Sequence, residues 1–370
     1  MSSEPHQRVV RFAIVGCGRI AKNHLQALAD VTGAELVAVC DLARERTRAY
    51  ADKYRVPSYD NYHKMLLTEN VDAVSILTPS GMHPAHAIDV MRRYRVHTII
   101  EKPMALALHD VGHMQLAASE AGVKIFPVYQ NRYNIAVQRV RRDLLGGALG
   151  KPVLGTVRVR WSRGAGYYAR DPWRGTWAMD GGALTNQGIH YLDLIQYLLG
   201  DVESVTASTA TRLVDVEVED TAVATVKFAS GALGVIEVTT AARPHDFEAS
   251  ISVLAEKGTA VLGGIAANRL DVYTLDPAAR ETSSQEFPDA YGYGHWPFFE
   301  DVVADLSSVR PHPISIEEGT RAIRLLNAMY RSAEDRREVR LDEGAVSHRL
   351  GRPDPALSAL YTTPAPEPAR

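Results

Sequence analysis

The chain has 370 residues, of which 41 are Lys or Arg and 44 are Asp or Glu, so its formal net charge is -3. That balance gives no general attraction to nucleic acid or to an anionic membrane. No apolar run is long enough to span a bilayer, and the first residues lack the apolar core of a signal peptide. We expect a cytoplasmic protein, large enough for two domains, in which Cys17 and Cys40 are reduced and buried.

The segment 11–21 is an apolar run that is broken by glycines and followed by a helix-compatible stretch. This pattern predicts a buried parallel strand that turns tightly into a helix. Gly16 permits the turn, Gly18 lets the backbone approach a pyrophosphate, and Ala21 lets the helix pack closely. A glycine turn in another kind of α/β protein is the alternative. We expect the whole motif to bind the phosphates of a dinucleotide at the helix N-terminus: Gly16, Gly18, Arg19, Ile20 and Ala21.

A second apolar run, residues 35–41, ends in an acid at the distance from the glycines where a ribose ligand is expected. The carboxylate of Asp41 is placed to bind the adenosine hydroxyls and to repel a 2′-phosphate, which favours NAD over NADP. Arg44 and Arg46 count against this preference, because an arginine can accommodate that phosphate.

Helical segments and apolar runs alternate from residue 11 to about 129, which is typical of a parallel sheet covered by helices on both faces. One run ends at Thr78 and Pro79, and ligands bind beyond the carboxyl ends of such strands. We expect these two residues and His83 to border the cofactor cleft. His83 and His86 are also spaced for metal binding, but no carboxylate or cysteine partner lies nearby, so we expect no metal.

Another strand, residues 97–101, runs directly into Lys102 and Pro103. The ordinary interpretation of a single lysine is an exposed surface residue. Here the proline keeps the preceding residue extended, so we expect the Lys102 side chain to project into the cleft. Glu101 and, after the last strand of this series, Gln130 are expected at the same edge.

From residue 153 the pattern changes to strands that follow one another with few helices between them. This predicts a large, open, mostly antiparallel sheet with one free face. In the register that we assume, Val205, Val214, Ile236 and Val238 point outward. Burial of this face against a second copy predicts a homodimer, or a homotetramer built as a dimer of dimers.

These patterns predict an α/β protein with two domains. We expect residues 1–130 to form a Rossmann domain with a doubly wound parallel sheet, and residues 131–352 to form an α+β domain for substrate binding and oligomerisation. Residues 353–370 are rich in Pro and Ala and are expected to form a poorly ordered tail.

Polar and aromatic side chains are dense between residues 158 and 200. Trp173 and Arg174 fall in a segment of poor periodicity, which predicts a loop that either contacts the cofactor or packs between the domains. As one helix, residues 180–199 place Asn186, His190 and Asp193 on one side. A helical histidine is usually a core or surface residue, but beside Asn186, and after a glycine-rich entry, His190 is a candidate acid or base.

Together these motifs resemble the Gfo/Idh/MocA family, which includes glucose-fructose oxidoreductases and inositol dehydrogenases. The resemblance implies a Rossmann domain, a second domain that oligomerises through its open sheet, and pyridine-nucleotide redox chemistry on sugars or polyols. The matching residues follow in order along nearly the whole chain: Gly16-x-Gly18-x-x-Ala21, Asp41, Thr78-Pro79 with His83, Glu101-Lys102-Pro103, Asn131-Arg132, and Gly181-Gly-x-Leu-x-Asn186-x-Gly-x-His190-x-x-Asp193.

The resemblance implies that Lys102 is the active-site lysine and His190 the catalytic histidine. Inositol dehydrogenases commonly have an aspartate where this chain has Asn186, and an amide cannot hold a proton for His190 in the same way. This difference favours Lys102 as the base. The segments most similar to UDP-N-acetyl-glucosaminuronate 3-dehydrogenases, which oxidise the C3 hydroxyl of a nucleotide-linked amino-sugar acid with NAD, are residues 171–177, 186–190 and 293–298.

We therefore expect reversible hydride transfer between NAD and a secondary hydroxyl of a sugar derivative. The arginines at 132, 163, 170 and 174 suit carboxylate or phosphate, which predicts an anionic substrate unless they form a solvated face. Inositol or a free hexose is the neutral alternative, and a non-catalytic sensor of NAD or sugar is the rival of another class. The expected substrate-binding residues are Lys102, Arg132, Arg163, Asn186, His190 and Tyr293.

Overall fold

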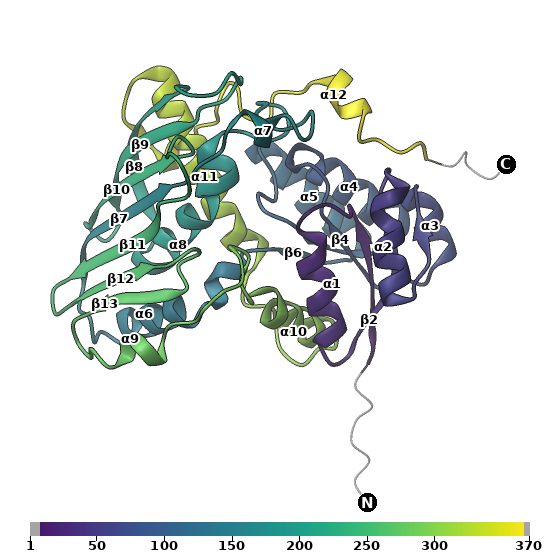
Figure 1. Cartoon of the computed structure of the whole chain (residues 1–370), viewed down its shortest axis with the longest axis horizontal. Helices are drawn as coiled ribbons and strands as arrows, with labels where there is room; N and C mark the ends of the chain where they lie inside the picture. Colours follow the sequence, from purple (N-terminus) through teal and green to yellow (C-terminus); the bar gives the residue numbers. More distant parts are fainter. Residues whose placement is uncertain (1–7, 366–370) are drawn as a thin grey trace, which may run out of the picture.

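The computed structural model describes residues 8–365, which form two sheets with helices packed on them (Figure 1). Sheet A is parallel, with the strand order β3-β2-β1-β4-β5-β6. Its strands are β1 (Val10–Val15), β2 (Ala34–Cys40), β3 (Ser58–Tyr59), β4 (Ala73–Ile76), β5 (His97–Ile100) and β6 (Ile125–Pro127). Because the order reverses between β1 and β4, a crevice for a ligand is expected beyond the carboxyl ends of these two strands.

The central strands of sheet A are buried on both faces, as parallel strands covered by helices must be. The helices in this part of the chain are α1 (Ala21–Asp30), α2 (Arg44–Tyr54), α3 (Tyr62–Thr68), α4 (His83–Tyr94) and α5 (Leu108–Ala121). The sequence prediction of a doubly wound parallel sheet is confirmed.

Helix α10 (His295–Leu306), from late in the chain, packs against α1 and completes the core of the first domain. The rings of Phe12 and Phe299 meet edge to face, with centroids 5.6 Å apart. A division of the chain at residue 130 therefore leaves out a helix that belongs to this core.

Sheet B has the strand order β13-β12-β11-β7-β10-β9-β8-β14. Its pairings are antiparallel except that of β7 with β10, which is parallel. Its strands are β7 (Pro152–Arg160), β8 (Val202–Ala210), β9 (Thr221–Phe228), β10 (Leu233–Thr239), β11 (Glu248–Ala255), β12 (Thr259–Gly263), β13 (Arg269–Tyr273) and β14 (Val339–Arg340). The predicted open, mostly antiparallel sheet is confirmed.

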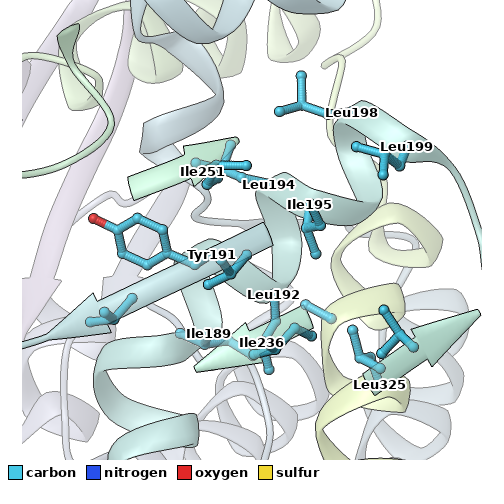
Figure 2. Packing of buried hydrophobic residues seen from close by; sticks show 14 of the residues in the cluster. Ile189, Tyr191, Leu192, Leu194, Ile195, Leu198, Leu199, Ile236, Ile251 and Leu325 are labelled. Carbon is cyan, nitrogen blue, oxygen red and sulfur yellow. The ribbon is translucent and has the colours of Figure 1, made fainter. Parts of the chain in front are cut away.

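Helices α6 (Ile135–Leu145), α8 (Ile189–Leu199) and α11 (Ile316–Asp335) cover the inner face of sheet B (Figure 1). Figure 2 shows the apolar side chains of α8 packed against Ile236, Ile251 and Leu325. The approach is close at Gly155 of β7, where an added Cβ would lie 2.6 Å from a methyl group of Leu199. This close packing holds α8 in place on the sheet. The N-terminal end of α8, which faces the first domain, is therefore also fixed.

Among the described residues no helix lies on the outer face of sheet B, but the side chains on this face are not those that we expected (Figure 1). Val205, Ile236 and Val238 are at most 1% exposed and point into the core, while Val214 lies in the loop after β8. The assumed register is therefore wrong by one residue, and such a slip exchanges the two faces of a strand. The large apolar side chains that are exposed on the outer face are Val223, Leu233, Val235, Leu254 and Val272.

The C-terminal segment, expected to be poorly ordered, is described as far as residue 365 and contains the short helix α12 (Pro355–Ala359). It packs on the first domain: the Tyr361 carbonyl contacts His86 Nε2 at 3.2 Å, and the Pro364 carbonyl accepts a hydrogen bond from Asn61. Residues 366–370 of the predicted tail lie outside the described residues.

Two further short helices are α7 (Ala165–Tyr168) and α9 (Ala279–Thr282). Within 8–365, no helix has both the length and the apolar character needed to cross a membrane.

Candidate active site

A pocket of about 800 Å³ lies at the carboxyl edge of sheet A, between the two domains. We call it the interdomain pocket. From the first domain it is lined by the loop after β1 and by residues that follow β2, β4 and β5. From the rest of the chain it is lined by the segment 167–174, which begins in α7, by Asn186 and Tyr291, and by part of the C-terminal segment. Of the predicted site residues, the pocket wall contains Gly16, Gly18, Arg19, Ile20, Asp41, Thr78, Pro79, His83, Glu101, Lys102, Trp173, Arg174 and Asn186.

The glycine loop has the geometry that a diphosphate requires. Gly16 has a φ of +100°, and a Cβ there would lie 2.6 Å from the carbonyl oxygen of Leu77. Gly18 has no neighbour within 4 Å of its Cβ position, so the backbone is open to a close ligand. In the part of the chain that is described, no side chain caps the N-terminus of α1. Its amides and helix dipole therefore suit a bound phosphate.

Asp41 stands at the end of β2, against the glycine loop. Its carboxylate accepts hydrogen bonds from the main-chain amides of Cys17 (2.7 Å) and Ala43 (2.9 Å), which fix its orientation. These bonds leave acceptor capacity on both oxygens for ribose hydroxyls. Arg46 also lines the pocket, but its guanidinium contacts Asp171 of the second domain at 3.5 Å.

Lys102 follows β5, and its Nζ donates a hydrogen bond of 3.1 Å to the main-chain oxygen of Asn186. Asn186 lies in a π-helical turn, Leu184–Gly188, that precedes α8. Burial lowers the pKa of Lys102; the carboxylates of Glu101 and Asp180 oppose this effect, and Arg174 adds to it. A lysine in this environment loses its proton more readily than one in water, as a base requires.

Glu101 anchors the other side of Lys102. One carboxylate oxygen is 3.0 Å from His24 Nε2 and 3.3 Å from His295 Nε2, and the other accepts from the Lys102 amide at 3.0 Å. Burial alone would raise the pKa of Glu101, but the two imidazoles that donate to it hold the pKa well below its ordinary range. Within residues 8–365, these three side chains are the one group spaced to hold a metal ion. The hydrogen bonds account for the arrangement without one.

Two histidines border Lys102. His83 contacts the carbonyl oxygens of Thr78 (2.8 Å) and Pro103 (2.9 Å), which ties the end of β4 to the segment after Lys102. His190, in the first turn of α8, is buried just outside the pocket wall. Burial, followed by the charge of Lys102, lowers the pKa of His190 well below its ordinary value. A neutral His190 is therefore expected across the pH range of an ordinary assay.

Two family models match the chain. Residues 10–129 match an oxidoreductase family with an NAD-binding Rossmann fold, and residues 137–261 match the GFO/IDH/MocA C-terminal domain. The chain belongs to the Gfo/Idh/MocA family. It is an oxidoreductase whose first domain is an NAD-binding Rossmann domain.

Relatives of this Gfo/Idh/MocA protein act on sugars and polyols. D-apiose dehydrogenase of Paraburkholderia graminis is 30% identical over 355 residues and is matched over 90% of each chain. Myo-inositol 2-dehydrogenase of Thermotoga maritima is 28% identical, over 90% of this chain and 99% of its own. Among solved structures, the WlbA dehydrogenase of Bordetella pertussis, in complex with NADH and UDP-GlcNAcA, is 40% identical. It superposes with a TM-score of 0.85 and covers 90% of this chain and 98% of its own.

Arg132, expected to bind substrate in this Gfo/Idh/MocA protein, is not in the pocket wall. Its guanidinium forms two hydrogen bonds with Asp193, of 2.6 and 2.8 Å, and a third with Glu318 of 2.9 Å. Burial alone would lower the pKa of Arg132, but these carboxylates outweigh it and raise the pKa. A buried, fully paired arginine cannot turn to a substrate without abandoning a buried carboxylate, so the assignment is corrected to a structural one.

The other predicted residues outside the wall have their own partners. Arg163 pairs with Asp246 at 2.9 Å and lies over the ring of Trp161. Gln130 is buried below the start of α10, and Ala21 packs in the core of the first domain. Tyr293 is 54% exposed and contacts the Phe287 ring.

Several residues in the pocket wall, and one directly behind it, were not predicted from the sequence. Tyr167 accepts a 2.7 Å hydrogen bond from Arg174. Asp180 lies directly behind Asn186. The C-terminal segment adds Leu360, Tyr361 and Thr363. The position of Asp180, a charged residue directly before Gly181 and Gly182, is a signal in the sequence that could have identified it. The C-terminal segment is rich in Pro and Ala, and no local pattern there indicates contact with a distant cleft.

Proposed function

We propose that this protein oxidises, reversibly and with NAD, a secondary hydroxyl of a nucleotide-linked sugar or sugar acid, at C3. One observation carries the proposal: the half-buried Lys102 side chain lines the same pocket as the glycine loop and Asp41. A proton-accepting group therefore lies next to the place where the dinucleotide fits. The likeness to the B. pertussis dehydrogenase, solved with a UDP-sugar acid, supports the substrate class.

In this proposal Lys102 accepts the proton of the substrate hydroxyl, and His190 lies nearby as a neutral imidazole. The cofactor, when bound, supplies the hydride acceptor. Asn186 and Glu101 hold Lys102 on its two sides, which limits the positions that its amine can take. Arg170 and Arg174 remain in the pocket wall as groups that suit an anionic substrate.

A neutral polyol or free sugar is the second candidate substrate. It is favoured by the position of Arg132, which lies outside the pocket wall and so offers no positive charge to an anionic substrate. The purified protein should be given NAD with UDP-GlcNAcA, UDP-GlcNAc, UDP-glucuronate, myo-inositol or D-apiose, and the absorbance of the reduced nicotinamide followed. Oxidation of UDP-sugar acids with the highest kcat/KM supports the proposal. Efficient oxidation of myo-inositol or D-apiose, with the UDP-sugars ignored, contradicts it.

We further propose a homodimer through the outer face of sheet B. Leu154 on β7 is the cross-strand partner of both Leu233 and Leu254, so these three residues form an apolar row. Val235, two residues along β10, extends it. Within residues 8–365 no helix covers this sheet face, and a two-fold contact would bury it in both copies (Figure 1). We also propose a cytoplasmic location, which suits the two free, buried cysteines.

A further inference from the structure

A buried carboxylate, Asp180, lies directly behind Asn186. It is 1% exposed, and one of its oxygens accepts a hydrogen bond from the Asn186 side-chain amide. Its other oxygen accepts from the Gly175 amide at 2.8 Å. Because the main-chain oxygen of Asn186 accepts from Lys102 at 3.1 Å, one residue joins this carboxylate to the lysine.

The local backbone holds this arrangement in place. The amide of Asp180 donates to the Thr176 carbonyl at 3.1 Å, and Gly181 follows with a φ of +66°. A Cβ on Gly181 would lie 2.3 Å from Thr185 Oγ1, so only glycine fits this tight entry to the π-helical turn. The Asn186 side chain is also held by Gln187, whose Nε2 donates to its Oδ1 at 3.1 Å. The link between Asp180 and Lys102 is therefore rigid on the side of Asn186.

The charges around Lys102 give Asp180 a distinct electrostatic role. The carboxylates of Glu101 and Asp180 stabilise the ammonium, whereas burial and the Arg174 guanidinium destabilise it. The imidazoles of His83 and His190 also face it, and burial lowers the pKa of both. Around Asp180 itself stand Arg174, Lys102 and the Tyr167 hydroxyl. Burial raises the pKa of Asp180 to about 6, so it is ionised at neutral and alkaline pH.

We propose that Asp180 is the positioning residue for Lys102: through Asn186 it fixes the lysine in the pocket, and its negative charge sets the pH at which the lysine becomes a base. This inference rests on the proposed function, in which Lys102 accepts the hydroxyl proton. An amide does not relay protons as a carboxyl does, so the action of Asp180 through Asn186 is electrostatic and geometric. Asp180 would thus supply the negative charge that residue 186, an amide, lacks.

The test is the pH dependence of kcat in the oxidation direction for Asp180→Asn, with Glu217→Gln as the matched control. Glu217 accepts a hydrogen bond from the Trp177 amide in the same loop but lines no part of the pocket. Loss of the negative charge should lower the pKa of Lys102 and move the acid limb of the profile to lower pH by about one unit. Loss of positioning should reduce kcat at the optimum about tenfold. In the control variant Glu217→Gln, the acid limb of the pH profile should lie at the same pH as in the parent enzyme.

Binding of NADH and thermal melting should be measured on both variants, to establish that they fold. An acid limb that stays in place in folded Asp180→Asn overturns the inference and leaves Asp180 a purely structural partner of Gly175. The titration of Lys102 should also be followed directly, by the pH dependence of its acylation rate read by mass spectrometry. If the parent enzyme oxidises none of the tested sugars but the acylation midpoint moves in Asp180→Asn, the proposed function fails, while the electrostatic coupling of Asp180 to Lys102 is supported.

Discussion

The Cys17 amide donates a 2.7 Å hydrogen bond to the carboxylate of Asp41, which joins the glycine loop to the end of β2. Asp41→Ala removes both this bond and the group expected to bind the adenosine ribose. Because a hydrogen bond to a charged group contributes about 1.5–3 kcal/mol, we expect the Kd for NADH to rise at least about tenfold. Discrimination against NADPH should shrink, since the repelling charge is gone. Fluorescence titration of both dinucleotides measures this, with exposed Asp52→Ala on α2 as the control. Unchanged NADH affinity would show that Asp41 does not contact the cofactor.

Lys102→Met keeps the length of the side chain and removes its amine. We expect kcat to fall about 10²- to 10⁴-fold, with NADH affinity nearly intact. For the parent enzyme, the oxidation rate should rise with pH, because the base must be unprotonated. The rise should be centred below 10.5, the ordinary pKa of a lysine, because burial lowers the pKa of Lys102. Full turnover in folded Lys102→Met would refute the assignment of the base.

The buried pair of Arg132 and Asp193 should affect stability rather than substrate binding. Arg132→Met leaves the carboxylate of Asp193 buried without its partner, and we expect a loss of about 3–5 kcal/mol in the free energy of unfolding. The double variant Arg132→Met/Asp193→Leu should recover much of that loss. Urea denaturation measures both. If Arg132→Met were as stable as the parent protein but had a raised KM for the substrate, Arg132 would have to be assigned to substrate binding after all.

The outer face of sheet B offers a direct test of assembly. Leu233→Lys and Val235→Glu place charges on the exposed apolar row, so light scattering at micromolar concentration should find a dimer for the parent protein and monomers for the variants. Leu116→Lys, on the exposed side of α5 in the other domain, is the control and should remain dimeric. A monomeric parent protein would exclude this interface.

The C-terminal segment should control how long the cofactor stays bound. A chain that ends at residue 352 lacks Leu360, Tyr361 and Thr363 of the pocket wall, and we expect NADH to dissociate about tenfold faster, because less apolar surface then covers the bound dinucleotide. Tyr361→Ala should show part of this effect, whereas Thr362→Ala, which is exposed and outside the wall, should show none. Stopped-flow displacement measures the rates. Equal dissociation rates for the truncated and full chains would show that the segment does not contact the cofactor.

Parts of the site that depend on residues close together in the sequence could be predicted from it. The glycine loop, Asp41 and Lys102 each stand at the end of a strand, and the carboxyl ends of parallel strands share one edge of a sheet. Features that depend on distant partners could not be predicted in the same way. Arg132 and Asp193 lie far apart in the chain, and no local pattern says that each neutralises the other.

Two further differences from the sequence prediction have geometric causes. The pattern of residues 180–199 predicts one regular helix, but the π-helical turn at Leu184–Gly188 alters its register, and Asp193 faces Arg132 instead of the pocket. In sheet B, alternation identifies two faces but not which of them is buried, and the covering helices α8 and α11 decide that.

The packing of α10 on α1 couples the folding of the two domains to the order of synthesis. Strands β1 to β6 leave the ribosome long before Phe298 and Phe299 are made, so an apolar face of α1 has no cover while sheet B is still being translated. The first domain cannot reach its final stability as a nascent chain. The apolar core that α1 shares with α10 can therefore close only after Phe298 and Phe299 have been synthesised, when most strands of sheet B have already been made.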